Sequence, residues 1–310
     1  MPVNATVLDL IGNTPLLELS RLYKGPGRLL GKAEFMQPGG SVKDRAAKRI
    51  IDDARADGRL QPGQPVVEMT SGNMGAGLAI VCNVYGHPFT VTMSAGNSPA
   101  RARMMEDLGT TVVLVEQVDG KPGEVTGADI AAATEHAREI AMKTDAFYVD
   151  QFNNPSSIAA HQEGTGPEIW DALDGNITAF VALLGSGGTY VGVTRFLKNK
   201  SSEIFCAPIE PAGAEILAGK PVMDPRHNMQ GTGYGIHLPH WRPDLADTYL
   251  AVTSNQAARY KKLLAEKEGL HLGYSSGGNV VAAIKLMESG RLGENPTVVT
   301  VLCDSGLKYQ

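Results

Sequence analysis

Short apolar runs alternate with amphipathic stretches along almost the whole chain. The apolar runs are rich in Val, Ile, Leu and Phe and are bounded by Gly, Pro or Asn. Runs of this kind are typical of strands that are buried on both faces of a parallel sheet. We expect strands at residues 29–35, 65–69, 89–93, 110–116, 146–150, 178–184, 203–210 and 297–302.

The stretches between these runs carry apolar residues at the spacing of helices. The clearest begins at Ser41, where Val42, Ala46 and Ile50 lie on one face. Further helices are expected at residues 77–86, 98–109, 127–143, 161–173, 192–200, 255–269 and 278–290. The alternation predicts the α/β class, with two doubly wound, three-layer domains around parallel sheets. No repeat or charged linker separates the halves, so a boundary is expected in the turn residues 151–155.

Composition narrows the class of partner. The 310 residues are 43% hydrophobic and 20% charged, as in globular proteins, and the net charge of -5 gives no electrostatic reason to expect nucleic acid or an anionic membrane as partner. No secretory signal pattern opens the chain, so a cytoplasmic location is expected. Cys82, Cys206 and Cys303 lack the paired spacing of a zinc site; we expect small buried residues there and no metal.

Lys43 lies where the first of these helices is expected to begin, within PGGSVKDR at 38–45. A helix N-terminus carries about half a positive charge. A lysine in the first turn is therefore favoured as the neutral amine, the form that Schiff-base chemistry requires. The glycines at 39 and 40 let another group approach the backbone closely. A solvated surface lysine is the alternative at this point.

A turn rich in small polar residues follows the expected strand at 65–69. Thr70, Ser71, Gly72 and Asn73 bring hydroxyls, an amide and backbone N–H groups to the start of a helix. Such a start suits a carboxylate or a phosphate. The alternative is that Thr70 and Ser71 only cap the helix.

Two more turns have the same character. Gly185–Thr189 suits a small phosphate, and Tyr190 excludes the dinucleotide fingerprint, which needs glycine there; a plain turn is the alternative. In GYSSGGN at 273–279, Ser275 or Ser276 could meet a ring nitrogen or cap the helix. The remaining polar residues receive structural interpretations: Arg101, Arg103 and Glu106 on a solvated helix face, His161 at a helix start, and His237 and His240 in a loop.

Eight motifs follow one another along the chain: IGNTPL at 11–16, PGGSVKDR at 38–45, TSGN at 70–73, QF-NP at 151–155, TGPEIW at 165–170, GSGGT at 185–189, GYSSG at 273–277 and DSG-(K)-Y at 304–309. Together they resemble the fold type II pyridoxal-phosphate enzymes of the cysteine synthase and cystathionine β-synthase family. The resemblance implies pyridoxal 5′-phosphate as cofactor and a fold like the tryptophan synthase β-subunit. It also implies a smaller, mobile substrate-binding domain at 40–151 and a larger cofactor-binding domain made of 1–39 and 152–310.

The resemblance also implies a role for each motif. Lys43 would form the covalent imine with the cofactor and later move a proton. Cofactor contacts are implied for Asn73 at the 3′-oxygen, for Gly185, Ser186, Gly187, Gly188 and Thr189 at the 5′-phosphate, and for Ser275 at the pyridine nitrogen. Contacts with the substrate α-carboxylate are implied for Thr70, Ser71, Gly72, Asn73, Met74 and Gln151.

The implied reaction is β-replacement on an O-activated L-serine through an aminoacrylate, in which O-acetylserine and sulfide give L-cysteine and acetate. Ser275 is neutral where many pyridoxal enzymes have Asp, so loss of a β-leaving group is favoured over transamination. The resemblance also implies a homodimer, with serine acetyltransferase as a candidate partner. A nucleotide-binding oxidoreductase or a silent binding module is the alternative from another class; Tyr190 counts against the first and Lys43 against the second.

Five positions depart from the usual cysteine synthase pattern and leave the nucleophile open. Met74 replaces Thr, as in the β-cyanoalanine synthase branch, and Tyr234 resembles cystathionine β-synthase. Tyr274 replaces a small aliphatic residue, and Cys303 and Leu307 replace Pro and Glu. β-Cyanoalanine synthase, cystathionine β-synthase-like condensation and cysteine desulfhydrase are therefore alternative activities.

Overall fold

The computed structural model describes residues 6–123, 125–224, 227–233 and 236–309. Contacts divide the chain into two compact units, which are residues up to Ile11 with Lys43–Ser157, and Gly12–Val42 with Ile158–Gln310. These units differ from the expected domains in three ways: residues up to Ile11 and residues 152–157 belong with the first unit, and residues 40–42 belong with the second. The expected mobility and ligand roles of the domains stay a prediction. Tyr234 lies outside the described residues.

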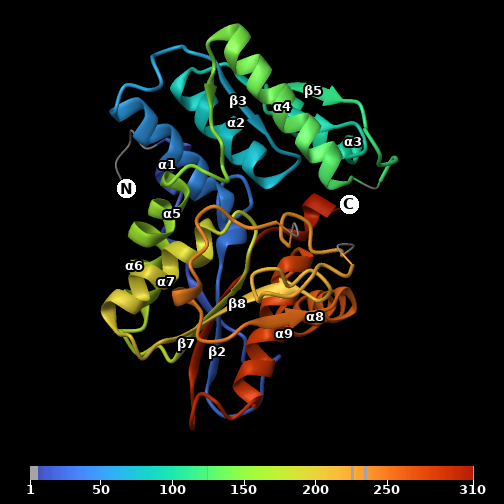
Figure 1. Cartoon of the computed structure of the whole chain (residues 1–310). Coiled ribbons are helices and arrows are strands. Elements are labelled where there is room, and N and C mark those ends of the chain that lie inside the picture. The colour runs from blue at the N-terminus through green and yellow to red at the C-terminus, as the bar shows by residue number, and fades with distance from the viewer. Residues whose placement is uncertain (1–5, 124, 225–226, 234–235, 310) are drawn as a thin grey trace. The chain divides into compact units, whose positions relative to one another are not determined.

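The first unit is a four-stranded parallel sheet with helices on both faces (Figure 1). Its strand order is β5-β4-β3-β6. One face packs on α1 and α2 through a core that includes Ile50, Leu78 and Val91. The other face packs on α4, where the Thr92 hydroxyl donates to the Ala133 carbonyl at 2.8 Å. The elements are α1 (Lys43–Ala56), β3 (Val66–Met69), α2 (Asn73–Tyr85), β4 (Phe89–Ser94), α3 (Pro99–Asp107), β5 (Thr111–Val115), α4 (Gly127–Thr144) and β6 (Phe147–Tyr148), preceded by a short 3-10 helix, Val7–Leu10.

The second unit is a six-stranded sheet with the order β1-β2-β10-β7-β8-β9. One face packs on α8 and α9 through residues that include Leu183 and Val280. The other packs on α7 through Phe180, Val191 and Leu197. The elements are β1 (Leu16–Glu18), β2 (Arg28–Lys32), α6 (Gly166–Ala172), β7 (Ala179–Leu183), α7 (Gly188–Lys200), β8 (Phe205–Pro211), β9 (Leu250–Val252), α8 (Ser254–Glu268), α9 (Tyr274–Glu288) and β10 (Thr297–Val301), with 3-10 helices at Glu34–Met36, Pro243–Leu245 and Gly306–Tyr309.

The α/β class and the two doubly wound units with parallel sheets are confirmed, with one correction to the strand directions. β1 runs antiparallel to β2, whereas every other strand pair is parallel. A short connection joins these two consecutive strands, and short connections produce antiparallel pairs. β1 has only three residues, and none of them is fully buried. The sequence therefore contains no buried apolar run that would predict this strand.

Four helices begin earlier than expected. α2, expected at 77–86, begins at Asn73, and α7, expected at 192–200, begins at Gly188. The helix expected at 161–173 begins with α5 (Ser156–Ala160) and passes through one π-helical turn, His161–Thr165, into α6. The helix expected at 278–290 begins at Tyr274, which places Ser275 and Ser276 in its first turn.

Two of the three cysteines are buried as expected. Cys82 and Cys206 are fully buried, and burial raises the pKa of each thiol to about 12. Cys303 is only partly buried, so the expectation was wrong there; its sulfur accepts a hydrogen bond from Asn279 Nδ2 at 3.3 Å. Within the described ranges, no helix is long and apolar enough to cross a membrane.

Candidate functional site

Lys43 is the first residue of α1, as expected, and it is partly buried. The chain approaches the helix through Gly40, whose φ of +68° is rarely adopted by residues with a side chain. A Cβ on Gly40 would also lie 3.2 Å from Lys308 Cε. Lys43 therefore lies at the positive end of the dipole of α1.

The helix that begins at Asn73 packs directly on the helix that begins at Lys43. Gly77 of α2 makes the close approach, because a Cβ there would lie 3.1 Å from Ala47 Cβ and 3.3 Å from Asp44 Oδ1. The two expected cofactor ligands of the first unit therefore open two neighbouring helices.

The N-terminus of α2 is not capped by the residues that precede it. Gly72 is the N-cap residue, and no side-chain cap hydrogen bond is found there among the described residues. The Thr70 hydroxyl instead accepts a weak bond from the Gly72 N–H at 3.4 Å. Capping of this helix start by a hydrogen bond from Thr70 or Ser71 is not found among the described residues, and a helix start of this kind suits an anion.

Met74 lies in the same first turn, but its side chain does not face the turn. It is 2% exposed and belongs to the apolar core with Leu78 and Met105. Any contact of Met74 with a substrate would therefore come from its backbone.

Arg101 contacts the turn, contrary to the solvated position expected for it. Its Nη1 donates to the Ser71 carbonyl at 3.2 Å and to the Ser71 hydroxyl at 3.4 Å. Arg103 and Glu106 are exposed as expected. The interpretation was wrong for Arg101 because the helical pattern does not reveal that this position of α3 faces the turn.

Gln151 follows β6 and reaches the neighbouring strand β3, which ends just before Thr70. The Gln151 side chain is buried, and its Nε2 donates to Glu68 Oε1 at 3.2 Å and to the Met69 carbonyl at 3.3 Å. The structure thus brings Gln151 to the base of the Thr70–Asn73 turn.

Glu68 is a residue of this site that the sequence analysis missed. It is 1% exposed in the middle of an otherwise apolar strand. Burial raises the pKa of its carboxyl to about 8, and the nearby Asp150 carboxylate adds to the effect. The signal available in the sequence was a charged residue within the run PVVEM.

In the second unit, Gly185–Thr189 connect β7 to α7. Gly187 is the N-cap residue, has φ +93°, and in the described part of the chain no side chain caps the helix. A left-handed residue before an uncapped helix start orients successive N–H groups toward one point, and such a concavity binds phosphate. The donors present therefore fit a phosphate group.

The Tyr190 side chain packs in the apolar core of the second unit and does not form part of the Gly185–Thr189 turn. It is fully buried, and its hydroxyl donates to the Leu245 carbonyl at 2.7 Å. This structural role accounts for the absence of the third glycine of the dinucleotide fingerprint.

His161 contacts the phosphate turn, whereas a helix-start position was expected for it. Its ring nitrogens lie 2.9 Å from Thr165 Oγ1 and 3.2 Å from Thr189 Oγ1. The π-helical turn carries this buried ring to the start of α7. His161 therefore orients the Thr189 hydroxyl, one of the expected phosphate ligands.

The two serines at the start of α9 have different environments. Ser276 Oγ accepts the Cys303 N–H at 2.9 Å, which gives it a structural role. Ser275 is buried, and the described residues around α9 provide no side-chain cap at the N-cap residue, Gly273. The ring of Tyr274 packs edge-on against the ring of Tyr309, with 6.2 Å between the ring centroids.

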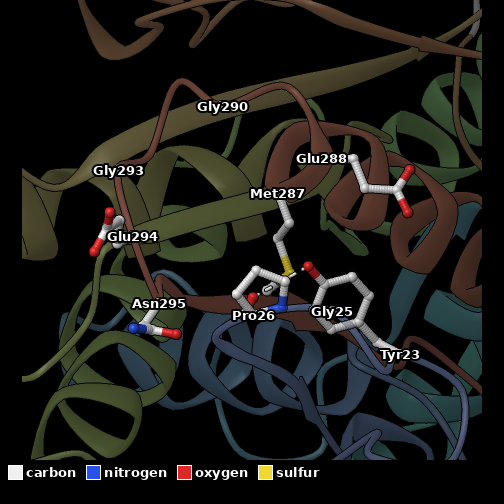
Figure 2. Close-up of a pocket in the computed structure, with 9 residues that line it drawn as sticks. All are labelled: Tyr23, Gly25, Pro26, Met287, Glu288, Gly290, Gly293, Glu294 and Asn295. Atoms are coloured by element: carbon white, nitrogen blue, oxygen red, sulfur yellow. Dashed lines mark hydrogen bonds between the residues drawn. The ribbon is translucent and has the colours of Figure 1, made fainter.

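A separate cavity of about 580 Å³ lies in the second unit (Figure 2). It is lined by Tyr23, Gly25, Pro26, Met287, Glu288, Gly290, Gly293, Glu294 and Asn295. These residues precede β2 and β10, so the cavity lies at the amino ends of the parallel strands. Ligands of open α/β sheets bind at the carboxyl ends, where Gly185–Thr189 lie. The cavity contains no expected site residue.

The structure thus forms two groups of expected site residues, one in each unit. The first contains Lys43, Thr70–Met74 and Gln151, and the second contains Gly185–Thr189 and Ser275. The chain is therefore an α/β protein with two helix starts, those of α2 and α7, that suit an anion.

Comparison with known proteins identifies the family. The profile of the family described as "Pyridoxal-phosphate dependent enzyme" matches residues 7–304, so the chain belongs to this family and its cofactor is pyridoxal 5′-phosphate. The chain is 35% identical to cysteine synthase A of Escherichia coli (strain K12) over 305 residues, which cover 96% of this chain and 91% of that protein. It is 36% identical to the O-acetylserine dependent cystathionine beta-synthase of Bacillus subtilis (strain 168) over 313 residues, with 100% and 97% coverage.

A solved structure gives the same result for the fold. The chain superposes on a hydrogen sulfide-producing enzyme from Fusobacterium nucleatum with a TM-score of 0.91 and 30% identity, covering 100% of this chain and 99% of that one. The resemblance stated from the motifs, the enzyme class, the cofactor and the fold are therefore confirmed.

Proposed function

We propose that the protein is a cysteine synthase, which replaces the acetate of O-acetyl-L-serine by sulfide and forms L-cysteine. The observation that carries the proposal is the 35% identity to cysteine synthase A over 96% of this chain. The two anion-suited helix starts support it, because the substrate is an amino acid with a free carboxylate and the cofactor carries a phosphate.

The residues of the second unit hold the cofactor in this proposal. The N–H groups and hydroxyls of Gly185–Thr189 bind the phosphate, and His161 orients Thr189. Ser275 offers a neutral hydroxyl to the pyridine nitrogen. When bound, pyridoxal phosphate supplies a conjugated electron sink that makes the α-proton of the amino acid acidic.

The residues of the first unit act on the substrate. The ε-amine of Lys43 holds the cofactor and moves the α-proton, and Asn73 donates to the cofactor 3′-oxygen. The start of α2 and the Gln151 amide bind the α-carboxylate. The C–O bond to acetate breaks as the α-proton leaves; hydrosulfide then forms the C–S bond, and a proton returns to the α-carbon.

The two units have different roles in the proposed reaction. We propose that the first unit is the mobile substrate-binding part and the second the cofactor-binding part. A homodimer in the cytoplasm, with serine acetyltransferase as a candidate partner, completes it. Light scattering of the purified protein tests the dimer, and co-purification with a serine acetyltransferase tests the partner.

A second candidate uses the same scaffold with another nucleophile. It is favoured by the 36% identity to an O-acetylserine dependent cystathionine beta-synthase over the whole chain. Homocysteine would then replace sulfide. Cyanide as nucleophile, or release of sulfide from cysteine, are the other reactions to be compared.

The test compares nucleophiles and one lysine variant. Purified protein is incubated with O-acetylserine and sulfide, cyanide or homocysteine in parallel, and sulfide should give the highest kcat/KM. Lys43→Ala should lower turnover by roughly a thousandfold or more, since it removes the proton-transfer group. Lys48→Ala is the matched control, because Lys48 lies on the same helix and pairs with Asp52 at 2.6 Å. Full activity of Lys43→Ala would refute the proposal.

A further inference from the structure

Glu68 is a buried carboxyl to which the proposed reaction gives no role. Its Oε1 accepts from Gln151 Nε2 at 3.2 Å, and the same nitrogen donates to the Met69 carbonyl at 3.3 Å. Both N–H groups of the Gln151 amide are thereby directed toward β3. In this orientation the amide presents its oxygen, which repels a substrate carboxylate.

In the described part of the chain, no cation is among the groups that act on the Glu68 carboxyl. Its buried Oε2 has no hydrogen-bond partner among the described residues. Asp150 and Tyr148 are the titratable groups nearby, and Arg138 of α4 acts on Tyr148. Burial and the Asp150 carboxylate raise the pKa of Glu68 to about 8, so its carboxyl is protonated at neutral pH.

The helices on the same face of the sheet are apolar where they meet it. Glu68 is in register with Val91 of β4 and so shares its face, which packs on α1 and α2. Among the described residues, the buried titratable groups of these two helices include Asp44, which lies against Gly77, and also Arg45 and Cys82.

A carboxylic acid and a carboxylate are different partners for an amide. The acid both donates and accepts, so it can pair with an amide in either orientation, whereas the carboxylate only accepts. When Glu68 is protonated, its O–H can donate to the Gln151 amide oxygen while Nε2 turns away from β3. When Glu68 is ionised, only the observed orientation satisfies both groups.

We propose that Glu68 is a positioning residue for the amino-acid substrate, whose acid form lets the Gln151 amide turn from β3 to donate to the substrate α-carboxylate. The inference rests on the proposed function, because it takes Gln151 as a ligand of that carboxylate. Substrate affinity is lost as Glu68 ionises, while the steps after binding change little.

The first experiment measures KM and kcat for O-acetylserine between about pH 6.5 and 9.5. For the wild type, KM rises about tenfold for each pH unit above the pKa of Glu68, and kcat changes much less. In Glu68→Gln the rise is absent, because the carboxamide both donates and accepts and never ionises. Ionisation of the substrate ammonium affects both proteins alike. A KM profile of Glu68→Gln that coincides with the wild type overturns the inference.

Variants of two neighbouring residues test whether Glu68 is the group that causes the rise in KM. Asp150→Asn removes the carboxylate that raises the pKa of Glu68, so the rise in KM moves to lower pH. Asn tolerates the left-handed conformation of position 150, where φ is +50°. Tyr148→Phe removes the other nearby titratable group and leaves the profile unchanged. If Glu68→Gln does not fold, a profile of Asp150→Asn identical to the wild type overturns the inference.

The second experiment is independent of β-replacement activity. Because the folded-state pKa of Glu68 lies above its unfolded value, the wild type loses stability relative to Glu68→Gln as pH rises from about 4.5 to about 8. The difference in melting temperature between the two proteins should therefore change over this range. A constant difference overturns the inference, whatever reaction the protein catalyses.

The third experiment separates the inference from the proposed function. L-Alanine lacks a β-leaving group, and its binding to the holoenzyme is followed by cofactor absorbance. If alanine affinity falls at alkaline pH in the wild type and not in Glu68→Gln, the inference stands even when no acetate is released from O-acetylserine. If it falls equally in both proteins, the inference fails while the proposed reaction can still hold.

Discussion

At the residue scale, the turn between β3 and α2 is controlled by side chains distant in sequence. Arg101 holds the carbonyl and the hydroxyl of Ser71, and Gln151 lies at the base of the same turn. The Arg101 guanidinium therefore lies beside a turn that already carries hydroxyl and N–H donors. Such a turn suits an anionic group such as an α-carboxylate.

Removal of Arg101 should weaken substrate binding more than it slows the reaction. Arg101→Ala takes away two hydrogen bonds from a charged donor, so we expect KM for the amino acid to rise roughly tenfold or more, with a smaller change in kcat. Arg103→Ala is the control, because Arg103 is exposed on the same helix. Steady-state kinetics on both variants test this; equal KM values for the two would mean that Arg101 does not shape the turn.

The sequence indicated contiguous groups of site residues by their composition, and the family resemblance added single residues such as Gln151. Neither indicated Glu68 or the contacts of Arg101 and His161, which pair with residues distant in the sequence. Thr70–Asn73 and Gly185–Thr189 were recognisable because each group is contiguous. The partners found only in the structure are separated by 30 residues for Arg101 and Ser71, 83 for Gln151 and Glu68, and 28 for His161 and Thr189. Helical and strand periodicity do not encode such pairings.

At the element scale, six helices of the described chain fall into two groups by whether a side chain caps their first turn. α3, α4 and α8 are capped by the side chains of Ser98, Thr126 and Thr253. α2, α7 and α9 begin after glycines, and the described residues supply no side-chain cap to them. The second group contains three of the helices whose starts include expected ligand residues, and a helix start without a side-chain cap suits an anionic ligand.

The left-handed glycine before α7 gives a prediction for cofactor binding. Gly187→Ala places a side chain at φ +93°, which costs about 1–2 kcal/mol of stability and distorts the phosphate turn. We expect weaker retention of pyridoxal phosphate, measured by cofactor absorbance after dialysis.

Gly290→Ala is the matched control for strain. Gly290 has φ +73°, and a Cβ there would meet open space. It should lose similar thermal stability without loss of cofactor. Equal cofactor loss in both variants would attribute the effect to general destabilisation.

The elements themselves were largely predictable from the hydrophobic pattern. Long strands and helices were found where apolar runs or helical spacing indicated them. The three-residue strands β1 and β9 were not, because so short a segment carries no period. The π-helical turn at His161–Thr165 was also beyond the pattern, since it differs from an α-helix by only one extra residue per turn.

At the scale of the whole molecule, each unit is assembled from segments that are not contiguous. Gly12–Val42 belongs to the second unit, where β2 pairs with β10. Two polar contacts fix this segment: the buried Thr14 Oγ1 donates to Glu34 at 2.6 Å, and the exposed Asn13 N–H donates to Glu168 at 3.0 Å. The resemblance to a family, and not the hydrophobic pattern, indicated that the first strands belong with the carboxyl-terminal half.

Lys32 of β2 connects the segment Gly12–Val42 to α6 through an ion pair, and its replacement should lower the stability of the protein. It is 1% exposed, pairs with Glu168 at 2.6 Å and donates to the Thr14 carbonyl. Lys32→Met should lower the free energy of unfolding by about 3 kcal/mol, because a largely buried carboxylate loses its cation. Arg28→Ala breaks the exposed pair with Glu18 on the same strand and should cost less than about 1 kcal/mol. Urea unfolding of both variants measures the difference. Adding Glu168→Gln to Lys32→Met should restore part of the loss, and no recovery would show that the charge left on Glu168 is not its cause.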